Sequence, residues 1–244
     1  MVTNSLGRMT VQLDSMINEV YKMEIEKKES ELRALQAQMN PHFLYNCLSG
    51  IKWKALRKGD DDISDITGLL AKFYRTALNN GQQITTVSSE LENIRAYIEI
   101  QKKMHEEPFE VEYRIDESGL ECCMPNFLLQ PLVENAIIHG LSKKEEGGTV
   151  RVHIWQKDGF TFITIGDNGL GMDEAALMHL RGELEKEDGK TGIGLGNIFR
   201  RIRAMYQDGN VEIYSKKDVG TVVKIQIRHK EVGEHDVSCV GGGR

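Results

Sequence analysis

Residues 149–165 read TVRVHIWQKDGFTFITI, and this stretch decides the class of fold. Its two ends, 149–156 and 160–165, alternate apolar with polar residues and are rich in β-branched and aromatic side chains, a pattern that is typical of strands. Asp158 and Gly159 lie between them, and an Asp-Gly pair favours the tight turn of a β-hairpin. The stretch therefore predicts two antiparallel strands that lie side by side.

Further strands and helices are predicted on both sides of this hairpin. The strand pattern recurs at 109–115, 211–215 and 221–228, whereas helices are predicted at 126–141, 173–181 and 197–206. Strands linked by hairpins, with helices between them, favour one mixed sheet that helices cover on one face. We therefore expect an α+β domain over residues 106–230.

The residues before this domain predict helices. Apolar residues recur in steps of three and four over residues 6–23, a heptad pattern that favours a coiled-coil or four-helix contact. One helix is expected over 9–57, although Pro41 interrupts it, and two more are expected at 63–78 and 89–105. A helical hairpin cannot bury all its apolar surface alone, so pairing with a second copy is expected.

Composition and charge narrow the class of protein. The 244 residues include 31 Lys and Arg and 37 Asp and Glu, so the net charge is -6. This balance argues against nucleic acid as a partner, because phosphate-backbone binding normally requires a basic face. The four cysteines lack metal-site spacing, so reduced thiols in the cytoplasm are expected. The sequence contains no run of about 18 apolar residues, so neither a membrane span nor a signal peptide is expected within it.

A first candidate site lies in LVENAIIHG, residues 132–140. On a helix, Asn135 and His139 are one turn apart, and Glu134 points in an adjoining direction. A carboxamide oxygen, a carboxylate and an imidazole in this arrangement suit a polyphosphate that carries Mg²⁺. A helix whose polar face simply meets water is the alternative, and this motif alone does not separate the two.

A second candidate is GDNGLGM, residues 166–172, directly after a predicted strand. Gly169 and Gly171 let the backbone approach a flat ligand closely, and Asp167 can accept a hydrogen bond from an exocyclic amine. An ordinary turn is the alternative for this segment.

The third candidate is KTGIGLGNIFRRI, residues 190–202. Its three glycines, Gly192, Gly194 and Gly196, precede the helix predicted at 197–206. Backbone N–H groups in such a loop, together with the helix N-terminus, form a natural phosphate cradle. The sequence contains no G-x-x-x-x-G-K-[ST] run, so this cradle is not a P-loop.

In this order and spacing, the three segments resemble the N, G1 and G2 boxes of the GHKL ATPase superfamily, which includes histidine kinases, gyrase, Hsp90 and MutL. The resemblance runs from Phe109 to Arg228, and Gly220-Thr221 is similar to the family's closing GT motif. It implies a GHKL-type α/β sandwich that binds ATP with Mg²⁺.

The same resemblance implies roles for individual residues. Asn135 would ligate Mg²⁺, Asp167 would bind the adenine amino group and His139 would approach the phosphates. Glu134 is expected among the catalytic residues. The ATP lid is expected to be short, at residues 184–190. Further residues would shape the pocket and its lid: Gly169, Gly171, Gly192, Gly194, Leu195, Gly196 and Thr221.

LQAQMNPHFLYNCL, residues 35–48, resembles the phosphoacceptor box of LytS/YesM-type sensor histidine kinases. The resemblance implies a homodimer that phosphorylates itself on His42 and passes the phosphoryl group to an aspartate on the receiver domain of a response regulator. A neutral imidazole is a competent nucleophile because its pKa lies close to neutrality. Asn46, one turn later, is linked in the family to dephosphorylation. Phe43 stands where many other histidine kinases carry an acidic residue as base.

The domain organisation follows from these resemblances. NSLGRMTVQLDSMINEV, residues 4–20, is similar to the second helix of a HAMP linker, the module that usually follows a transmembrane segment. We expect four parts: the end of a HAMP linker at 1–27, dimerisation and phosphoacceptor helices at 28–105, an ATP-binding domain at 106–230 and a disordered tail at 231–244. The chain as given is expected to be cytoplasmic, and the full-length protein is expected in the cell membrane, attached only through transmembrane segments outside this sequence.

Two other functions stay open from the sequence. One is a GHKL ATPase that never phosphorylates protein, and the other is a dimeric signalling scaffold that binds nucleotide without turnover. The phosphoacceptor box and the heptad pattern count against the ATPase. The intact set of Asn135, Asp167 and glycines counts against the scaffold. A sensor histidine kinase is therefore the leading hypothesis.

Overall fold

The computed structural model describes residues 41–78, 82–104, 108–141, 147–185 and 193–230. It divides into two compact units, Met1–Asn46 and Cys47–Arg244. The heptad pattern, the HAMP-like segment, most of the expected lid and the C-terminal tail lie outside the described residues. The predictions for those segments therefore stay predictions.

Three helices lead into the α/β part of the chain. They are α2 (Pro41–Lys58), α3 (Asp61–Leu78) and α4 (Val87–Met104), and they confirm the helices predicted there. Gly59 makes the turn between α2 and α3 with φ of 73°, a conformation that glycine adopts without steric cost. The side chain of Asp60 then accepts a hydrogen bond from the N–H of Ile63 at 3.1 Å, which caps the start of α3.

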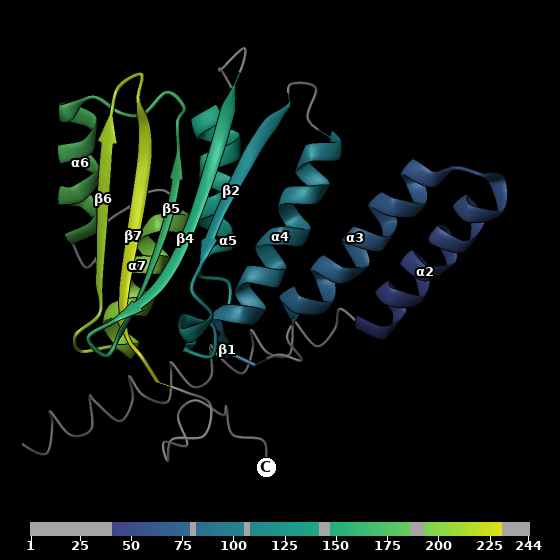
Figure 1. The fold of residues 1–244 in the computed structure, drawn as a ribbon, viewed down its shortest axis with the longest axis horizontal. Helices are drawn as coiled ribbons and strands as arrows, with labels where there is room; N and C mark the ends of the chain where they lie inside the picture. The colour runs from purple at the N-terminus through teal and green to yellow at the C-terminus, as the bar shows by residue number, and fades with distance from the viewer. Residues whose placement is uncertain (1–40, 79–81, 105–107, 142–146, 186–192, 231–244) are drawn as a thin grey trace, which may run out of the picture. The chain divides into compact units, whose positions relative to one another are not determined.

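The five long strands form one mixed sheet, as predicted (Figure 1). Its order is β2-β4-β5-β7-β6; β2 is parallel to β4, and the other neighbours are antiparallel. The strands are β2 (Phe109–Ile115), β4 (Gly148–Lys157), β5 (Phe160–Asp167), β6 (Asn210–Lys216) and β7 (Gly220–Arg228). The predicted hairpin is present, since β4 pairs with β5 across Asp158-Gly159.

Helices cover one face of this sheet and leave the other open. Alternate strand residues such as Val152, Ile163 and Ile225 are fully buried, whereas their neighbours Arg151 and Thr164 lie on the open face. Figure 1 shows α5 and α7 behind the strands. The covering helices are α5 (Gln130–Glu134), α6 (Glu174–Glu185) and α7 (Ile193–Met205). The predicted layering is confirmed.

Helix α4 belongs to the same hydrophobic core. Its residues Val87, Leu91, Ile94 and Ile98 are buried in one cluster with residues of the covering helices and of the sheet. This helix therefore connects the helical hairpin with the α/β part through packed side chains.

The helix predicted at 126–141 is wrong in its first turn and in its geometry. Cys123–Pro125 forms a short strand, β3, that pairs antiparallel with β1 (Ile84–Thr86), and a 3₁₀ turn, η2 (Glu117–Gly119), precedes it. The helix begins only at Gln130, because Phe127 has a φ of 57°, which no right-handed helix permits. From Asn135 it continues as a π-helix, η3 (Asn135–Leu141).

The buried face of β7 provides a test of this fold. Ile225 is fully buried between β5 and β6, while Gln226 beside it lies on the open face. We expect Ile225→Ala to lower the free energy of unfolding by about 2–5 kcal/mol, because it leaves a cavity in the core. Urea unfolding would measure this loss, with Gln226→Ala as the matched control. Equal stability of the two variants would contradict the layering.

Candidate functional site

The first predicted motif makes up most of the α5–η3 helix. Glu134 and His139 are exposed, and Asn135 is half-buried at the junction where the α-helix becomes a π-helix. Such π-helical turns are rare and occur frequently at functional sites. The exposed carboxylate of Glu134 lies close enough to Tyr97 of α4 to act on it: burial, together with this charge, raises the pKa of Tyr97 to about 12.

The second motif touches the end of this helix directly. Asp167 closes β5, is 7% exposed, and its Oδ1 accepts a hydrogen bond from the N–H of Gly169 at 2.8 Å. A Cβ placed on Gly169 would lie 1.8 Å from the carbonyl oxygen of Gly140, and one on Gly140 would lie 2.6 Å from the carboxyl carbon of Asp167. A side chain on Gly169 would require a shift of backbone, and a side chain on Gly140 would displace the carboxylate of Asp167. The structure therefore brings the first and second motifs into contact.

Gly171 and the closing Gly-Thr pair complete this loop. Gly171 has φ of 58°, and a Cβ there would lie 2.0 Å from the carbonyl oxygen of Lys216 on β6. Gly220 has φ of 126°, with its Cβ position 2.0 Å from the carbonyl oxygen of Asp167. The hydroxyl of Thr221 lies 2.9 Å from that of Ser215. These two glycines allow the backbone of the β6–β7 hairpin to pack directly against the loop that follows β5.

The third motif differs from the prediction. Gly194, Leu195 and Gly196 do not precede a helix but form the first turn of α7, which begins at Ile193. Gly192 lies outside the described residues. Because the first turn of a helix leaves its N–H groups without helical partners, the phosphate-cradle argument still applies to this turn. The Cβ position of Gly194 is 3.6 Å from Pro131 of α5, so the starts of the two helices are neighbours.

Sequence reasoning missed Asn168, which fixes the same loop. Its Oδ1 accepts the N–H of Thr149 at 2.8 Å, and its Nδ2 donates to the carbonyl of Gly147 at 3.0 Å. The loop after β5 is thereby tied to the start of β4. A lone asparagine after a strand predicts only a turn, so its long-range partners gave no signal in the sequence.

The phosphoacceptor candidates lie on α2. Helical geometry places Asn46 one turn after His42, as predicted, and Asn46 is exposed. Phe43 is 68% exposed. These residues belong to the first compact unit, whereas the three nucleotide motifs belong to the second.

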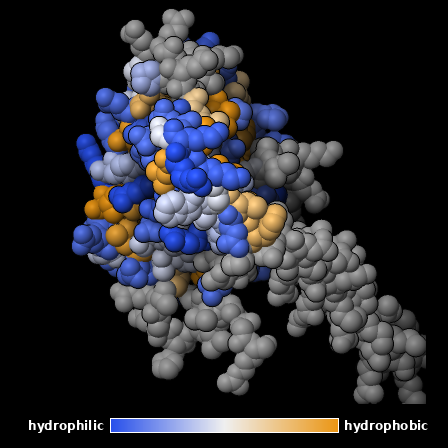
Figure 2. Space-filling view, turned by 90° about the vertical axis from the view of Figure 1, so that its right-hand side faces the viewer, coloured by the Kyte–Doolittle hydropathy of each residue, from blue (hydrophilic) through white to orange (hydrophobic). Residues whose placement is uncertain are grey.

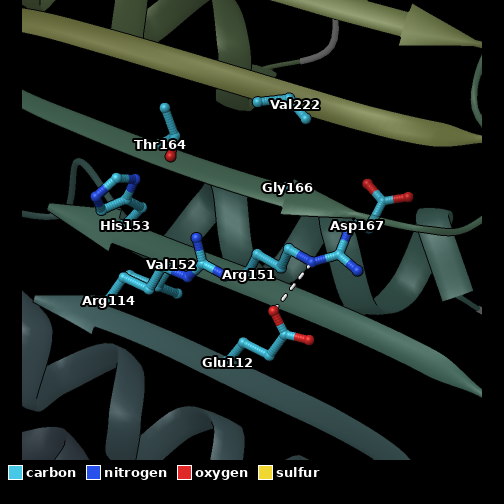
Figure 3. A pocket seen from close by; sticks show the side chains of 9 residues that line it. All are labelled: Glu112, Arg114, Arg151, Val152, His153, Thr164, Gly166, Asp167 and Val222. Carbon is cyan, nitrogen blue, oxygen red and sulfur yellow. Dashed lines mark hydrogen bonds and ion pairs between the residues drawn. The ribbon is translucent and has the colours of Figure 1, made fainter.

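A hollow of about 310 Å³ lies on the open face of the sheet (Figure 3). Arg114, Arg151, His153 and Thr164 project into it from β2, β4 and β5, and Arg151 is paired there with Glu112 at 3.2 Å. The Asn135 helix and the start of α7 do not line this hollow. Asp167 also lines this hollow, so at that residue the hollow adjoins the nucleotide site expected on the helix-covered side.

The residues on the covered side fit a bound nucleotide. The carboxylate at the end of β5 can accept a hydrogen bond from an amine, and two nearby glycines, which have no room for a side chain, supply a backbone cradle. The start of α7 supplies N–H donors for phosphate. Asn135 offers the carboxamide oxygen that Mg²⁺ accepts.

Two family models match successive parts of the chain. The model described as "Histidine kinase" matches residues 30–109, and the one described as "Histidine kinase-, DNA gyrase B-, and HSP90-like ATPase" matches residues 126–231. The chain belongs to the histidine kinase family. The ATPase model covers all three nucleotide motifs, which supports ATP as the nucleotide.

Curated relatives agree with this family. The chain is 35% identical over 91% of its length to "Sensor histidine kinase YesM" of Bacillus subtilis (strain 168), and 29% identical over 96% of its length to "Sensor protein LytS" of Bacillus anthracis. It spans 38% and 41% of the length of these relatives. The predicted likeness to LytS and YesM is confirmed.

A solved histidine kinase domain from Erythrobacter litoralis, of the EL346 blue-light activated kinase, aligns with a TM-score of 0.43 at 15% identity, covering 76% of this chain and 95% of that one. The family assignment rests on the sequence matches. Among the described residues of this histidine kinase, none of the helices combines the length and apolar character that crossing a bilayer requires.

The contact between the first two motifs can be tested at Gly169. We expect Gly169→Ala to weaken ATP binding by about tenfold or more, because the added methyl group collides with the Gly140 carbonyl and separates Asp167 from the helix end. Titration with a fluorescent ATP analogue would measure the change.

Gly182→Ala is the matched control, because nothing lies within 4 Å of a Cβ at Gly182 in α6. Unchanged affinity in a folded Gly169→Ala variant would contradict the assignment of this loop to the nucleotide site.

Proposed function

We propose that this chain is the kinase portion of a two-component sensor, which transfers the γ-phosphoryl group of ATP to His42. A ring nitrogen of the neutral His42 imidazole attacks the γ-phosphorus; the N–P bond forms, the bond to the bridging oxygen breaks, and ADP leaves. One observation carries the proposal: a phosphoacceptor box on α2 and an assembled set of three nucleotide motifs occur in one chain.

The roles of the site residues are part of this proposal. Asp167 accepts a hydrogen bond from the adenine amino group, and the first turn of α7 with Gly194 and Gly196 receives the phosphates. Asn135 would hold Mg²⁺, which neutralises charge on the phosphates. Glu134 and His139, both exposed near Asn135, would contact the triphosphate.

Phosphoryl transfer onward is proposed on family grounds. The aspartate of a response-regulator receiver domain would take the phosphoryl group from His42, and Asn46 would act in its removal. Phe43 offers no proton acceptor, so the base that assists His42 must come from elsewhere than the following residue.

A homodimer is proposed from the surface of the helical hairpin. Five large apolar side chains on α2 and α3 are more than 40% exposed: Phe43, Ile51, Trp53, Leu56 and Ile63. Figure 2, which views the molecule from the side of these helices, shows hydrophobic patches among hydrophilic side chains there. A second copy would cover this apolar surface of the hairpin.

Membrane attachment is proposed only for the full-length protein. It rests on the likeness of residues 4–20 to a HAMP linker. Residues 4–20 lie outside the described residues.

Labelling with γ-³²P-ATP tests the kinase proposal. We expect acid-labile label on the wild type and its loss in His42→Ala and in Asn135→Ala, because the first removes the nucleophile and the second the proposed metal ligand. His179→Ala, an exposed histidine on α6, is the control and should keep the label.

Three outcomes separate the alternatives. Label that persists in His42→Ala would overturn the phosphoacceptor assignment. Phosphate release without label on protein would favour a GHKL ATPase, and nucleotide binding without either product would favour a scaffold. Circular dichroism must first establish that both loss-of-label variants are folded.

Analytical ultracentrifugation tests the homodimer. We expect Trp53→Ala to raise the dissociation constant of the dimer at least about tenfold, because a two-fold interface repeats each substitution and tryptophan is enriched among residues that dominate binding. Met178→Ala is the control, since Met178 on α6 is 63% exposed, similar to the 67% of Trp53. A monomeric wild type, or equal dissociation constants, would contradict the proposal.

A further inference from the structure

Glu90 is a buried carboxylate to which none of the proposed steps assigns a role. It lies on α4, is 2% exposed, and faces the turn that precedes α5. Its Oε1 accepts the N–H of Phe127 at 2.7 Å, and its Oε2 accepts the N–H groups of Leu128 and Leu129 at 2.8 and 2.9 Å. Three successive backbone donors thus surround one side chain, an arrangement that binds anions in proteins.

The turn that Glu90 holds is conformationally strained. Phe127 has φ of 57°, a left-handed conformation that a bulky residue adopts only when its surroundings enforce it. The carboxylate supplies that enforcement, since it is the acceptor for the N–H of Phe127 and for the two that follow. Burial raises the pKa of Glu90, while these hydrogen bonds and the charge of Arg201 on α7 oppose the shift.

The nucleotide-binding helix starts from this turn. The carbonyl of Leu129, whose N–H is held by Glu90, accepts the N–H of Val133 at 3.2 Å and so opens the helical bonding of α5. The N–H of Asn135 bonds within the same helix to the carbonyls of Pro131 and Leu132. Only five residues lie between the clamped backbone of Leu129 and Asn135, and they form the regular helical turn of α5.

Two groups earlier in the chain support the same turn. The N–H of Asn126 donates to the carbonyl of Gln83 at 2.8 Å, and its side-chain Nδ2 donates to the carbonyl of Ala77 at the end of α3. These bonds hold the residue before Phe127, but none reaches the N–H groups of residues 127–129. Glu90 is therefore the described acceptor that sets how α5 begins.

We propose that Glu90 is a positioning residue, which fixes the start of α5 and thereby aims Asn135 at the metal-bound phosphates. The inference rests on the proposed nucleotide and Mg²⁺ roles of that helix. It assigns to α4, a helix that precedes the ATP-binding part in sequence, a direct effect on the nucleotide site.

Glu90→Gln is a sharp test because it keeps the size of the side chain. The carboxamide oxygen can still accept the two N–H groups of Leu128 and Leu129, but the amide nitrogen then faces the N–H of Phe127, donor against donor. The substitution removes the bond to the strained residue whether the wild-type carboxyl is ionised or not. Glu92→Gln, exposed on the same helix, is the matched control.

The measurement compares ATP affinity in Mg²⁺ with ATP affinity in EDTA. For Glu90→Gln we expect affinity in Mg²⁺ to fall roughly three- to tenfold and affinity in EDTA to change less than about twofold, because the displaced group is the metal ligand. Glu92→Gln should match the wild type in both. A merely structural role of Glu90 would lower both affinities alike and leave their ratio unchanged.

A second substitution reports on the strain itself. Glycine adopts a φ of 57° without steric cost, so Phe127→Gly in the Glu90→Gln background should restore part of the Mg²⁺-dependent affinity. If Glu90→Gln does not fold, the two affinities are measured instead on Glu90→Asp, whose carboxylate is withdrawn by one methylene group, with the same expectation.

An unchanged ratio of the two affinities in a folded Glu90 variant overturns the inference. So does a wild type that binds ATP equally with and without Mg²⁺, because Asn135 would then hold no metal. A wild type that shows this metal dependence but never labels His42 contradicts the proposed kinase alone, since the affinity ratio does not depend on phosphoryl transfer.

Discussion

The nucleotide side of this molecule depends on a contact between two backbones. The Cβ position of Gly169 lies 1.8 Å from the carbonyl oxygen of Gly140, a distance at which no side chain fits. The N–H of Leu170 donates to that same carbonyl at 3.0 Å. The end of the η3 helix and the loop after β5 are therefore joined by main-chain atoms, and Asp167 is held between them. Side-chain packing at this junction would keep the two elements several ångströms further apart.

The same principle extends to the β6–β7 hairpin. Gly171 and Gly220 leave no room for a Cβ against the carbonyls of Lys216 and Asp167. The end of η3, the loop after β5 and the β6–β7 hairpin therefore stack backbone against backbone, without side chains between them. The position of Asp167 thus depends on the register of the sheet. On the opposite face, cross-strand ion pairs such as Arg151–Glu112 and Lys224–Glu212 let the sheet meet water. One face of the sheet thus packs against helices, and the other is exposed to water.

The sequence was sufficient for the strands, because alternation with period two is a local signal that the five long strands carry clearly. It also predicts one candidate site for Asn135, Asp167 and Gly194, since their order and spacing resemble those of a known family. It failed where the deciding contact is distant in the chain. The late start of α5 depends on Phe127 and on Glu90, which is 37 residues away and whose exposed or buried state no local pattern reveals. The helical state of the first turn with Gly194 was missed because three glycines in five residues favour a loop.

Helix α4 contacts both the hydrophobic core and the start of α5. Its apolar residues Leu91, Ile94 and Ile98 lie in the core beside the covering helices, and its Glu90 holds the turn from which α5 starts. A shift of α4 relative to the sheet would have to break hydrogen bonds to three consecutive N–H groups, and those of Leu128 and Leu129 would be left buried and unpaired. Moving α4 by itself therefore costs more free energy than moving α4 and α5 together. Helix α3 packs along α4, and the Thr76 hydroxyl on α3 accepts a hydrogen bond from Nδ2 of Asn93 on α4 at 3.0 Å, so α4 is tied both to the helical hairpin and to the turn from which α5 starts.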